Sequence, residues 1–284
     1  MLETNSIPVS IIIMTRNNDS HLRQCLDSVL PFNEIFVVDS QSTDQTLDVA
    51  KQSHARIISY EWDGSPMKKK QWCLTHLPFK NNWVFYLDAD EIMTRKCAKE
   101  IQGLVHDPHA ADGYFVTAQH VLRGQKLNHG MHNRKLAFFK KDSFYYPEIK
   151  QKLDHDIGEV EGHYQPLPVH SDSTIARLSN TIEHHAFDDM NAYTVRHERY
   201  ARWEAEMTLK ERWPNDPIGW RQHIKRVLRQ SLLRPAFLFF YSFIVKAGFL
   251  DGINGYRYAR YKSAYARRVL FFLKDFNAQY KAGA

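Results

Sequence analysis

The sequence predicts an α/β fold with a mainly parallel sheet, followed by a basic, aromatic C-terminal helical extension. Two observations indicate the sheet: short apolar runs alternate with helical patterns of about ten residues, and polar residues follow these runs. The third observation is a split in charge. Residues 218–284 hold 13 Lys and Arg against two acids, a formal charge of +11, whereas the other 217 residues carry −5. The same segment holds 15 of the 37 aromatic residues.

The overall composition is that of a globular protein with an ample core. The chain has 284 residues, of which 43% are hydrophobic and 25% are charged. These values exclude disordered, collagen-like and disulfide-scaffold classes. Three cysteines without a C-x-x-C pair indicate a reducing compartment. Because residues 1–8 lack a basic and apolar leader pattern, we expect a cytoplasmic protein.

The first half alternates predicted strands and helices. The strands are expected at residues 9–14, 35–38, 56–59 and 83–87. The first is a β-branched apolar run, typical of a strand buried on both faces. Helical patterns follow the strands: one is capped by Asp19 or Ser20, a short one follows Asp44, one covers 66–77, and one is capped by Thr94. This alternation favours parallel strands joined by helices.

The second half is less regular. Strands are expected at 114–121 and 136–139, residues 145–172 show little periodicity, and a helical pattern begins near Asn191. A Pro-rich break at Trp213–Pro217 indicates a boundary. We therefore expect one domain over residues 1–215, with halves 1–105 and 106–215, and a helical segment over 216–284.

Polar residues end three of the predicted strands at one edge of the sheet. They are Thr15-Arg16-Asn17, Asp39, and Asp88-Ala89-Asp90. Ligands of open parallel sheets bind at the carboxyl ends of the strands. Two carboxylates at i and i+2 suit Mg²⁺ or Mn²⁺, which bridge to phosphate oxygens. The alternative is that the Asp-x-Asp triplet only begins a turn.

Residues 8–105 resemble the nucleotide-sugar binding half of glycosyltransferase family 2, a group of inverting enzymes with the GT-A fold. Four motifs carry the resemblance: Thr15-Arg16-Asn17, Val38-Asp39-Ser40 with Ser42-Thr43-Asp44-Gln45-Thr46, Lys70-Gln71-Trp72, and Asp88-Ala89-Asp90. The similarity continues more loosely to about residue 206. It is strongest to bacterial transferases of lipopolysaccharide-core and exopolysaccharide synthesis. The resemblance implies a Rossmann-like GT-A domain whose second half, residues 106–215, binds the acceptor.

The resemblance also implies a set of donor-binding residues: Thr15, Asn17, Asp39, Ser42, Lys70, Asp88 and Asp90. Thr15 and Asp39 would contact the nucleoside of a UDP-sugar, and Lys70 would lie near its phosphates. Asp88 would face the ribose or sugar, and Asp90, with Asp88, would hold Mn²⁺ or Mg²⁺. Two alternatives stay open. Asp39 could cap the loop after its strand, and the run Lys68-Lys69-Lys70 could be a solvated helix face.

Inverting transfer needs a base that deprotonates the acceptor hydroxyl. The resemblance places this base beyond the Asp-x-Asp triplet, where Glu161 is the first candidate and Asp156 the second. Candidates on the acceptor side are His129, His132, Arg134 and His163. No thiol accompanies the histidines at zinc-site spacing, so we expect no zinc site.

Other functions are less consistent with the sequence. The processive members' Thr-Glu-Asp and Gln-x-x-Arg-Trp motifs are absent, which favours the addition of a single sugar. A nucleotidyltransferase is an alternative, but the loop after the first strand contains no glycine. A nucleic-acid-binding protein is a further alternative, but no known binding module supports it. We therefore expect no nucleic-acid partner.

The basic C-terminal segment predicts contact with an anionic surface. Its apolar run, residues 235–245, has about half of the roughly 20 residues that a membrane-spanning helix needs. Residues 251–255 are predicted to form a turn before a second aromatic and basic helix at 256–276. Two such helices favour an interfacial anchor over 218–276 that holds a cytoplasmic enzyme on the inner face of the plasma membrane. The alternative is packing on the catalytic body or, in a homodimer, on a second copy.

Overall fold

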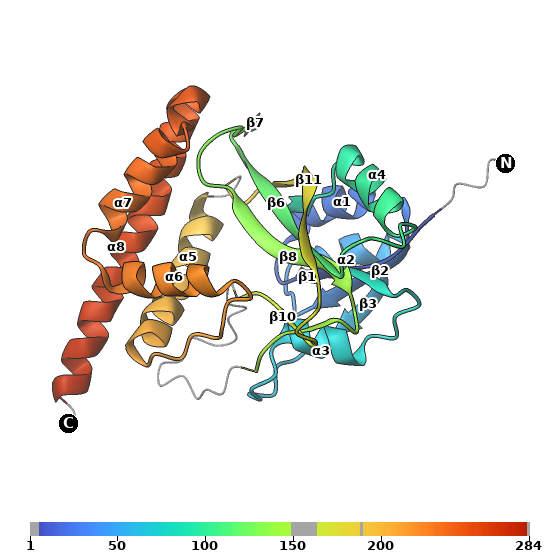
Figure 1. Ribbon diagram of the computed structural model, residues 1–284, viewed down its shortest axis with the longest axis horizontal. Coiled ribbons are helices and arrows are strands. Elements are labelled where there is room, and N and C mark those ends of the chain that lie inside the picture. Colours follow the sequence, from blue (N-terminus) through green and yellow to red (C-terminus); the bar gives the residue numbers. More distant parts are fainter. Residues whose placement is uncertain (1–5, 149–163, 188–189, 283–284) are drawn as a thin grey trace. The chain divides into compact units, whose positions relative to one another are not determined.

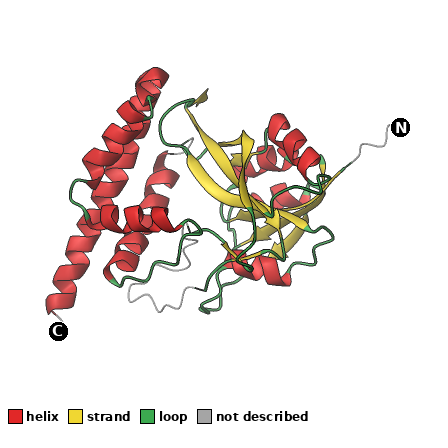
Figure 2. Ribbon diagram, in the orientation of Figure 1, coloured by secondary structure: helices red, strands yellow, loops and turns green. Residues whose placement is uncertain are grey.

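The structure, a computed structural model, describes residues 6–148, 164–187 and 190–282 (Figure 1). The chain forms two compact units. The first consists of Met1–His120, Asn133–Glu148 and Gln165–His185, and the second of Val121–His132, Ile149–Tyr164 and Ala186–Ala284. Strands dominate the described part of the first unit and helices that of the second (Figure 2). The second unit reaches further toward the N-terminus than the helical segment predicted from residue 216.

Four parallel strands form one half of the sheet in the first unit. They are β1 (Ile7–Thr15), β2 (Phe32–Asp39), β3 (Arg56–Ser59) and β4 (Trp83–Asp88). Their order is β3-β2-β1-β4, because β1 pairs with both β2 and β4, and β2 pairs with β3. Each predicted strand of the first half lies inside one of these elements. The Val and Ile side chains of β1 and the apolar side chains of β4 are buried, as their continuous hydrophobic runs predict.

Four helices connect or follow these strands: α1 (Asp19–Ser28), α2 (Thr46–Lys51), α3 (Lys69–His76) and α4 (Arg95–Leu104). α1 leads from β1 to its neighbour β2, and α2 leads from β2 to the edge strand β3. The connection through α3 then crosses back to β4, which lies on the other side of β1. With right-handed crossovers, α1 and α2 therefore cover one face and α3 the other (Figure 1). Thr94 caps α4 as predicted, since its hydroxyl accepts the backbone N–H of Cys97 at 3.2 Å.

Antiparallel pairs extend the sheet. Its other half follows the order β8-β6-β11-β5, with β8 (Asn133–Lys140), β6 (Gly113–Leu122), β11 (Ile175–His184) and β5 (Glu91–Ile92). β8 runs antiparallel to β4 and β6, whereas β11 runs parallel to β6. In the first unit, β9 (Phe144–Tyr145) pairs with β10 (Leu167–Pro168). β7 (Gln125–Lys126) pairs with the end of β6 through residues that belong to the second unit. The sheet is thus mixed, and β11 was not predicted from the sequence.

The strand register aligns the polar strand ends. Thr15 pairs with Asp39 across β1 and β2, and Met14 pairs with Asp88 across β1 and β4. Asp39 also pairs with Ser59 of β3. The parallel strands therefore present these residues together at their carboxyl edge, where such sheets bind ligands.

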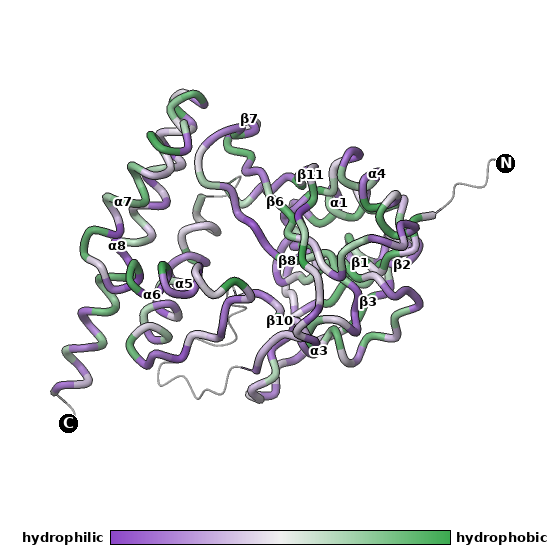
Figure 3. Tube along the Cα trace, viewed as in Figure 1, coloured by the Kyte–Doolittle hydropathy of each residue, from purple (hydrophilic) through white to green (hydrophobic). Residues whose placement is uncertain are grey.

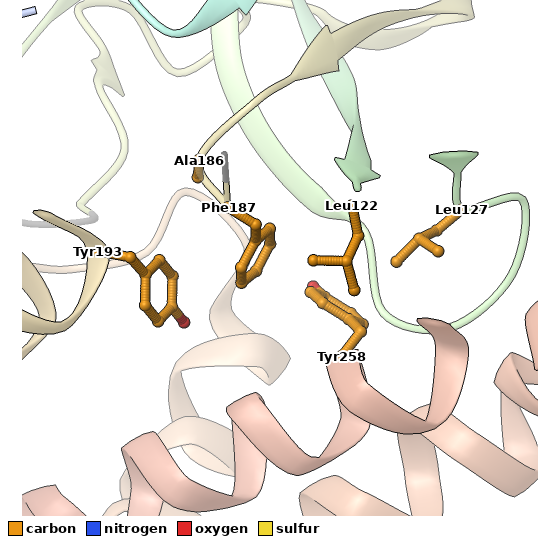
Figure 4. Close-up of a cluster of buried hydrophobic side chains, with 6 residues drawn as sticks. All are labelled: Leu122, Leu127, Ala186, Phe187, Tyr193 and Tyr258. Carbon is orange, nitrogen blue, oxygen red and sulfur yellow. The ribbon is translucent and has the colours of Figure 1, made fainter. Parts of the chain in front are cut away.

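The described part of the second unit is mainly helical. It contains α5 (Met190–Leu209), α6 (Gly219–Gln230), α7 (Arg234–Phe240), the π-helical turn η1 (Tyr241–Val245), the 3₁₀ turn η2 (Gly248–Asp251) and α8 (Gly252–Ala282). α5 packs on α8 through Ala201, Ala205, Val269, Phe272 and Phe276. A second cluster surrounds Tyr258 of α8 (Figure 4), and its other members are Leu122, Leu127, Ala186, Phe187 and Tyr193.

The chain turns sharply between α7 and α8, and these two helices contact each other (Figure 1). The turn predicted at residues 251–255 is wrong in its position, because η2 ends at Asp251 and α8 begins at Gly252. Gly255 lies inside α8, where a Cβ would stand 1.8 Å from the carbonyl oxygen of Gly248. The tight backbone contact therefore requires glycine at this position.

Among the described residues, no single helix has both the length and the apolarity to span a membrane. One bent pair, Arg234–Val245 with Gly248–Lys281, meets the length and composition requirement when its two parts are taken together, with a bend of 74°.

Candidate functional site

A hydrogen-bonded loop network surrounds Asp39 at the end of β2. The Asp39 carboxylate accepts the backbone N–H of Ser42 at 2.9 Å and also bonds the Ser42 hydroxyl. The Ser42 hydroxyl accepts the N–H of Asn17 at 2.8 Å, and the Asn17 side chain accepts the N–H of Thr43 at 2.8 Å. These contacts join the loops after β1 and β2. Asp39 therefore does cap its loop, and the donor-binding role of Asp39, Asn17 and Ser42 stays a prediction.

The lysine run at the start of α3 is not a solvated face. Lys68 and Lys69 are buried. The Lys69 ammonium donates to the carbonyl of Thr15 at 3.3 Å and to the hydroxyl of Ser40 at 2.9 Å, so it ties α3 to the carboxyl edge of the sheet. Lys70 is half-buried and lies 5.8 Å from the ring centre of Tyr146. The solvated-face alternative is wrong for Lys68 and Lys69.

Asp88 is half-buried and belongs to a charge cluster around the buried Glu91 that the sequence did not predict. The ammonium of Lys135, on β8, contacts the Asp88 carboxylate at 2.9 Å and also contacts Glu91. Glu91 in turn accepts the backbone N–H of Asp88 at 2.9 Å. Lys135 therefore joins two carboxylates that are three residues apart and fixes the turn between β4 and β5.

Burial and charge set the pKa values in this cluster. Burial opposes the ionisation of Asp88, but the ammonium groups of Lys135 and Lys70 outweigh it and hold the pKa of Asp88 below its usual value. Burial raises the pKa of Glu91 to about 7 against the attraction of Lys135. Burial also works against the charged form of Lys135, but the two carboxylates raise its pKa above the usual value.

Asp90 faces His184, a histidine of the pair His184-His185 that the sequence did not assign to the metal site. The Asp90 carboxylate is 3.5 Å from Nε2 of His184, at the end of β11, and the backbone carbonyl of Asp90 accepts the N–H of His185 at 2.8 Å. The pairing of His184 with Glu91 across β11 and β5 brings these residues together. Burial lowers the pKa of His184, but the Asp90 carboxylate outweighs it and raises this pKa above its usual value.

The Asp90 and His184 side chains fit a divalent cation that is shared with a substrate. A carboxylate oxygen and an imidazole nitrogen are both ordinary ligands of Mn²⁺, and the remaining positions suit phosphate oxygens and water. Within residues 6–148, 164–187 and 190–282, no three His, Cys, Asp or Glu side chains gather into a set that could hold a metal alone. Asp88 is engaged by Lys135, and its predicted metal contact stays a prediction.

The predicted acceptor-side residues belong to different parts of the chain. Arg134 is an exposed residue of β8 in the first unit, whereas His129 and His132 belong to the second unit. Asp251 accepts the backbone N–H of His129 at 2.8 Å, and its carboxylate lies 3.2 Å from Nδ1 of the same residue. His129 thus helps to hold its loop against η2. The remaining candidates, Asp156, Glu161 and His163, lie outside the described residues.

Comparisons with known proteins identify the family of the chain. The profile of glycosyl transferase family 2 matches residues 10–172, more than half of the chain. An uncharacterized glycosyltransferase of Rickettsia typhi is 31% identical over 111 residues, which cover 38% of this chain and 36% of that protein. The glycosyltransferase SunS of a Bacillus subtilis prophage is 31% identical over 97 residues, 33% of this chain and 22% of SunS. The chain thus matches about a third of the length of the Rickettsia relative.

Among solved structures, glucosyl-3-phosphoglycerate synthase from Mycobacterium tuberculosis matches 41% of this chain and 44% of its own, with 22% identity and a TM-score of 0.31. That structure contains Mn²⁺, UDP and glucosyl-3-phosphoglycerate. The likeness is distant, and the family assignment rests on the sequence profile. From the extent of that match, the chain belongs to glycosyl transferase family 2.

Proposed function

We propose that the chain is a metal-dependent, inverting glycosyltransferase that moves one sugar from a UDP-sugar to a saccharide or lipid-linked saccharide. The observation that carries the proposal is the pair formed by Asp90 and His184 beside Asp88, at the carboxyl edge of the sheet in a member of this family. Carboxylates and an imidazole at such an edge suit a cation and a diphosphate.

The donor would lie along this edge. Thr15 and Asp39 are paired at the ends of β1 and β2, and we assign them to the nucleoside. Lys135 bonds one oxygen of Asp88, and we assign the other oxygen to a ribose or sugar hydroxyl. Lys70 would lie near the phosphates, and Asp90 and His184 would hold the cation. When bound, Mn²⁺ or Mg²⁺ would neutralise the charge of the departing UDP.

The chemical step needs a base opposite the leaving group. We assign this role to Glu161, with Asp156 as the second candidate. The carboxylate would take the proton of the acceptor hydroxyl while the hydroxyl oxygen bonds to the anomeric carbon. The bond between that carbon and the phosphate oxygen breaks with inversion, and UDP leaves with the electron pair.

We place the acceptor in bacterial surface polysaccharide or lipopolysaccharide synthesis. Residues 8–105 resemble transferases of those pathways, and the motifs of processive members are absent. We assign His129, His132, Arg134 and His163 to the acceptor side. A lipid-linked acceptor would also be consistent with the exposed apolar residues of the C-terminal helices.

Nucleotide binding tests the metal site. At a concentration about 100 times its Kd, UDP with Mn²⁺ should stabilise the folded state by about 2.7 kcal/mol. This stabilisation should raise the Tm by roughly 5–10 °C. Asp90→Asn and His184→Ala should each remove most of this shift. Asp48→Asn, which changes an exposed carboxylate on α2, should keep it. A full shift in Asp90→Asn would exclude Asp90 as a metal ligand.

Product analysis tests the reaction. Incubation with a panel of nucleotide sugars should release UDP slowly without an acceptor. Release of pyrophosphate from UTP and a sugar phosphate would indicate a nucleotidyltransferase instead. Glu161→Gln should keep the UDP-dependent rise in Tm but lose transfer. Retained turnover in Glu161→Gln, with loss in Asp156→Asn, would move the base to Asp156.

A further inference from the structure

Exposed hydrophobic side chains are concentrated in one stretch of the second unit, residues 220–256. Thirteen of the nineteen exposed large hydrophobic residues that the structure describes lie there. They are Trp220, Ile224, Val227, Leu232, Leu233, Phe237, Phe240, Ile244, Val245, Phe249, Leu250, Ile253 and Tyr256. Figure 3 shows hydrophobic residues recurring along α7 and the turn after it. Such a concentration marks an interaction surface rather than ordinary scattered exposure. We call these residues the exposed apolar segment.

The spacing of these residues places them on continuous helix faces. Trp220, Ile224 and Val227 follow the i, i+4, i+7 pattern of one side of α6, which buries none of its residues. Phe237, Phe240 and Ile244 follow the related i, i+3, i+7 pattern along α7 and η1. The core of the unit uses other residues, because α8 packs on α5 through Val269, Phe272 and Phe276. The exposed apolar segment is therefore additional to the packed core.

The charges around the segment are positive. Residues 217–250 contain six Lys and Arg and no Asp or Glu, and Asp251 is buried. Four of the six are used internally, and one of them, Arg221, lies 3.9 Å from the buried carboxylate of Asp216. Arg234 pairs with Glu204, Lys225 pairs with Asp216 at 2.6 Å, and Arg229 lies 3.5 Å from the ring centre of Trp213.

Other cations in or beside the segment face solvent. The Arg226 side chain is 76% exposed and reaches Glu211 only at 3.9 Å. Lys246 and Arg260 are also exposed, each over a neighbouring tyrosine ring. Exposed apolar side chains between exposed cations are the pattern of an interfacial membrane element.

We propose that the exposed apolar segment, through α6, α7 and the turn to α8, docks on the surface of an anionic lipid bilayer. The apolar side chains enter the interface, and Arg226, Lys246 and Arg260 contact anionic head groups. A second copy is the less suitable occupant. A symmetric contact through this segment would bring its exposed cations against one another without an exposed acid from residues 217–250 to compensate. The proposal does not depend on the reaction catalysed.

Vesicle sedimentation with the full chain tests the proposal. The probes are vesicles of phosphatidylcholine alone and of phosphatidylcholine with one quarter phosphatidylglycerol, without donor or metal. We expect binding to the anionic vesicles that weakens with salt. Val245→Glu/Leu250→Glu should lower the partition constant at least about tenfold, because two apolar contacts are lost and two negative charges are added.

Matched variants separate this segment from other exposed surfaces. Leu30→Glu/Val195→Glu changes two hydrophobic residues of similar exposure, 59% and 74% against 67% and 61%, outside the segment. This control should bind vesicles as the wild type does. Arg226→Gln/Lys246→Gln should weaken binding to anionic vesicles, whereas Arg95→Gln/Lys99→Gln on α4 should not.

Three results would overturn the proposal. The wild-type chain could fail to bind anionic vesicles, or the control pairs could lose as much binding as the segment variants. Alternatively, light scattering could show a dimer that Val245→Glu/Leu250→Glu converts to a monomer, with no vesicle binding by either protein. That outcome would make the segment an interface between two copies.

Discussion

Lys135 should be a main determinant of stability in the first unit. Its ammonium contacts Asp88 and Glu91, and both acids depend on it for charge compensation. Lys135→Met keeps most of the aliphatic volume and removes the charge. The Glu91 side chain has no exposed surface and that of Lys135 is 17% exposed, so water cannot replace the lost contact.

The magnitude follows from this burial. Removing one member of a buried ion pair costs about 3–5 kcal/mol, because the remaining charge stays uncompensated. The Asp88 side chain is 41% exposed, so loss of its contact adds only about 0–1 kcal/mol. In a domain of about 150–250 residues, 1 kcal/mol shifts the Tm by about 2–4 °C. We therefore expect Lys135→Met to cost about 3–6 kcal/mol and to lower the Tm by roughly 6–24 °C.

Urea and thermal unfolding of Lys135→Met, Glu91→Gln and the double variant measure this effect. Glu91→Gln keeps an acceptor for the N–H of Asp88 but removes the charge. The double variant should recover part of the loss, with a coupling of about 1–3 kcal/mol. Lys140→Met on the same strand is the control, because its pair with Asp112 is more exposed and should contribute about 0–1 kcal/mol. The role of Lys135 would be refuted if the effects of the two substitutions on the free energy of unfolding were additive. It would also be refuted if Lys135→Met alone lowered that free energy by less than about 1 kcal/mol.

Further predictions concern three other positions. Gly255→Ala should lower the Tm, since its Cβ would stand 1.8 Å from the carbonyl oxygen of Gly248 and disturb the turn between α7 and α8. An unchanged Tm would contradict this, because it would mean that the backbone at Gly248 can move away without loss of stability. Phe272→Ala should cost about 3–5 kcal/mol in urea unfolding, because it empties part of the α5–α8 core. Hydrogen bonds from Lys140 and Thr174 hold the pKa of Asp112 below its usual value, so its ionised form adds stability above about pH 4 that is lost as the pH falls through the lowered pKa. Asp112→Asn should thus be about 1 kcal/mol less stable at pH 7, and the difference should vanish in acid.

Much of the fold was predictable where the pattern is local. The strands that became β1, β2 and β4 contain continuous apolar runs, and helical patterns follow the strands. The capping predictions were less reliable, because Thr94 caps α4 but no side chain of the N-cap residue caps α1, where the cap was expected at Asp19 or Ser20. β11 was not predicted, because only its residues Leu178 and Ile182 are buried and it shows neither a continuous apolar run nor strict alternation. Its position depends on pairing with β6 and β5, which are distant in the sequence.

The candidate site shows the same limit. Asp39, Asp88 and Asp90 were found because each follows an apolar strand. Lys135 and His184 gave no comparable signal, since Lys135 stands in the polar run Asn133-Arg134-Lys135 and His184 in the pair His184-His185, and both lie in strands remote in sequence from the triplet. The Asp-x-Asp-Glu spacing is visible in the sequence, but the need of Glu91 for a cation appears only once its burial is known.

The sequence by itself determined the α/β class and the basic charge of the C-terminal segment. It also determined that the polar residues after the first strands lie together at the carboxyl edge of the sheet. These follow from hydrophobic period, strand direction and composition, which are properties of neighbouring residues. Only the tertiary structure decided that Lys135 joins Asp88 to Glu91, that His184 faces Asp90, and which C-terminal side chains stay exposed. The physical reason is that burial and ion pairing arise between strands and helices far apart in the chain, where register and packing set the distances.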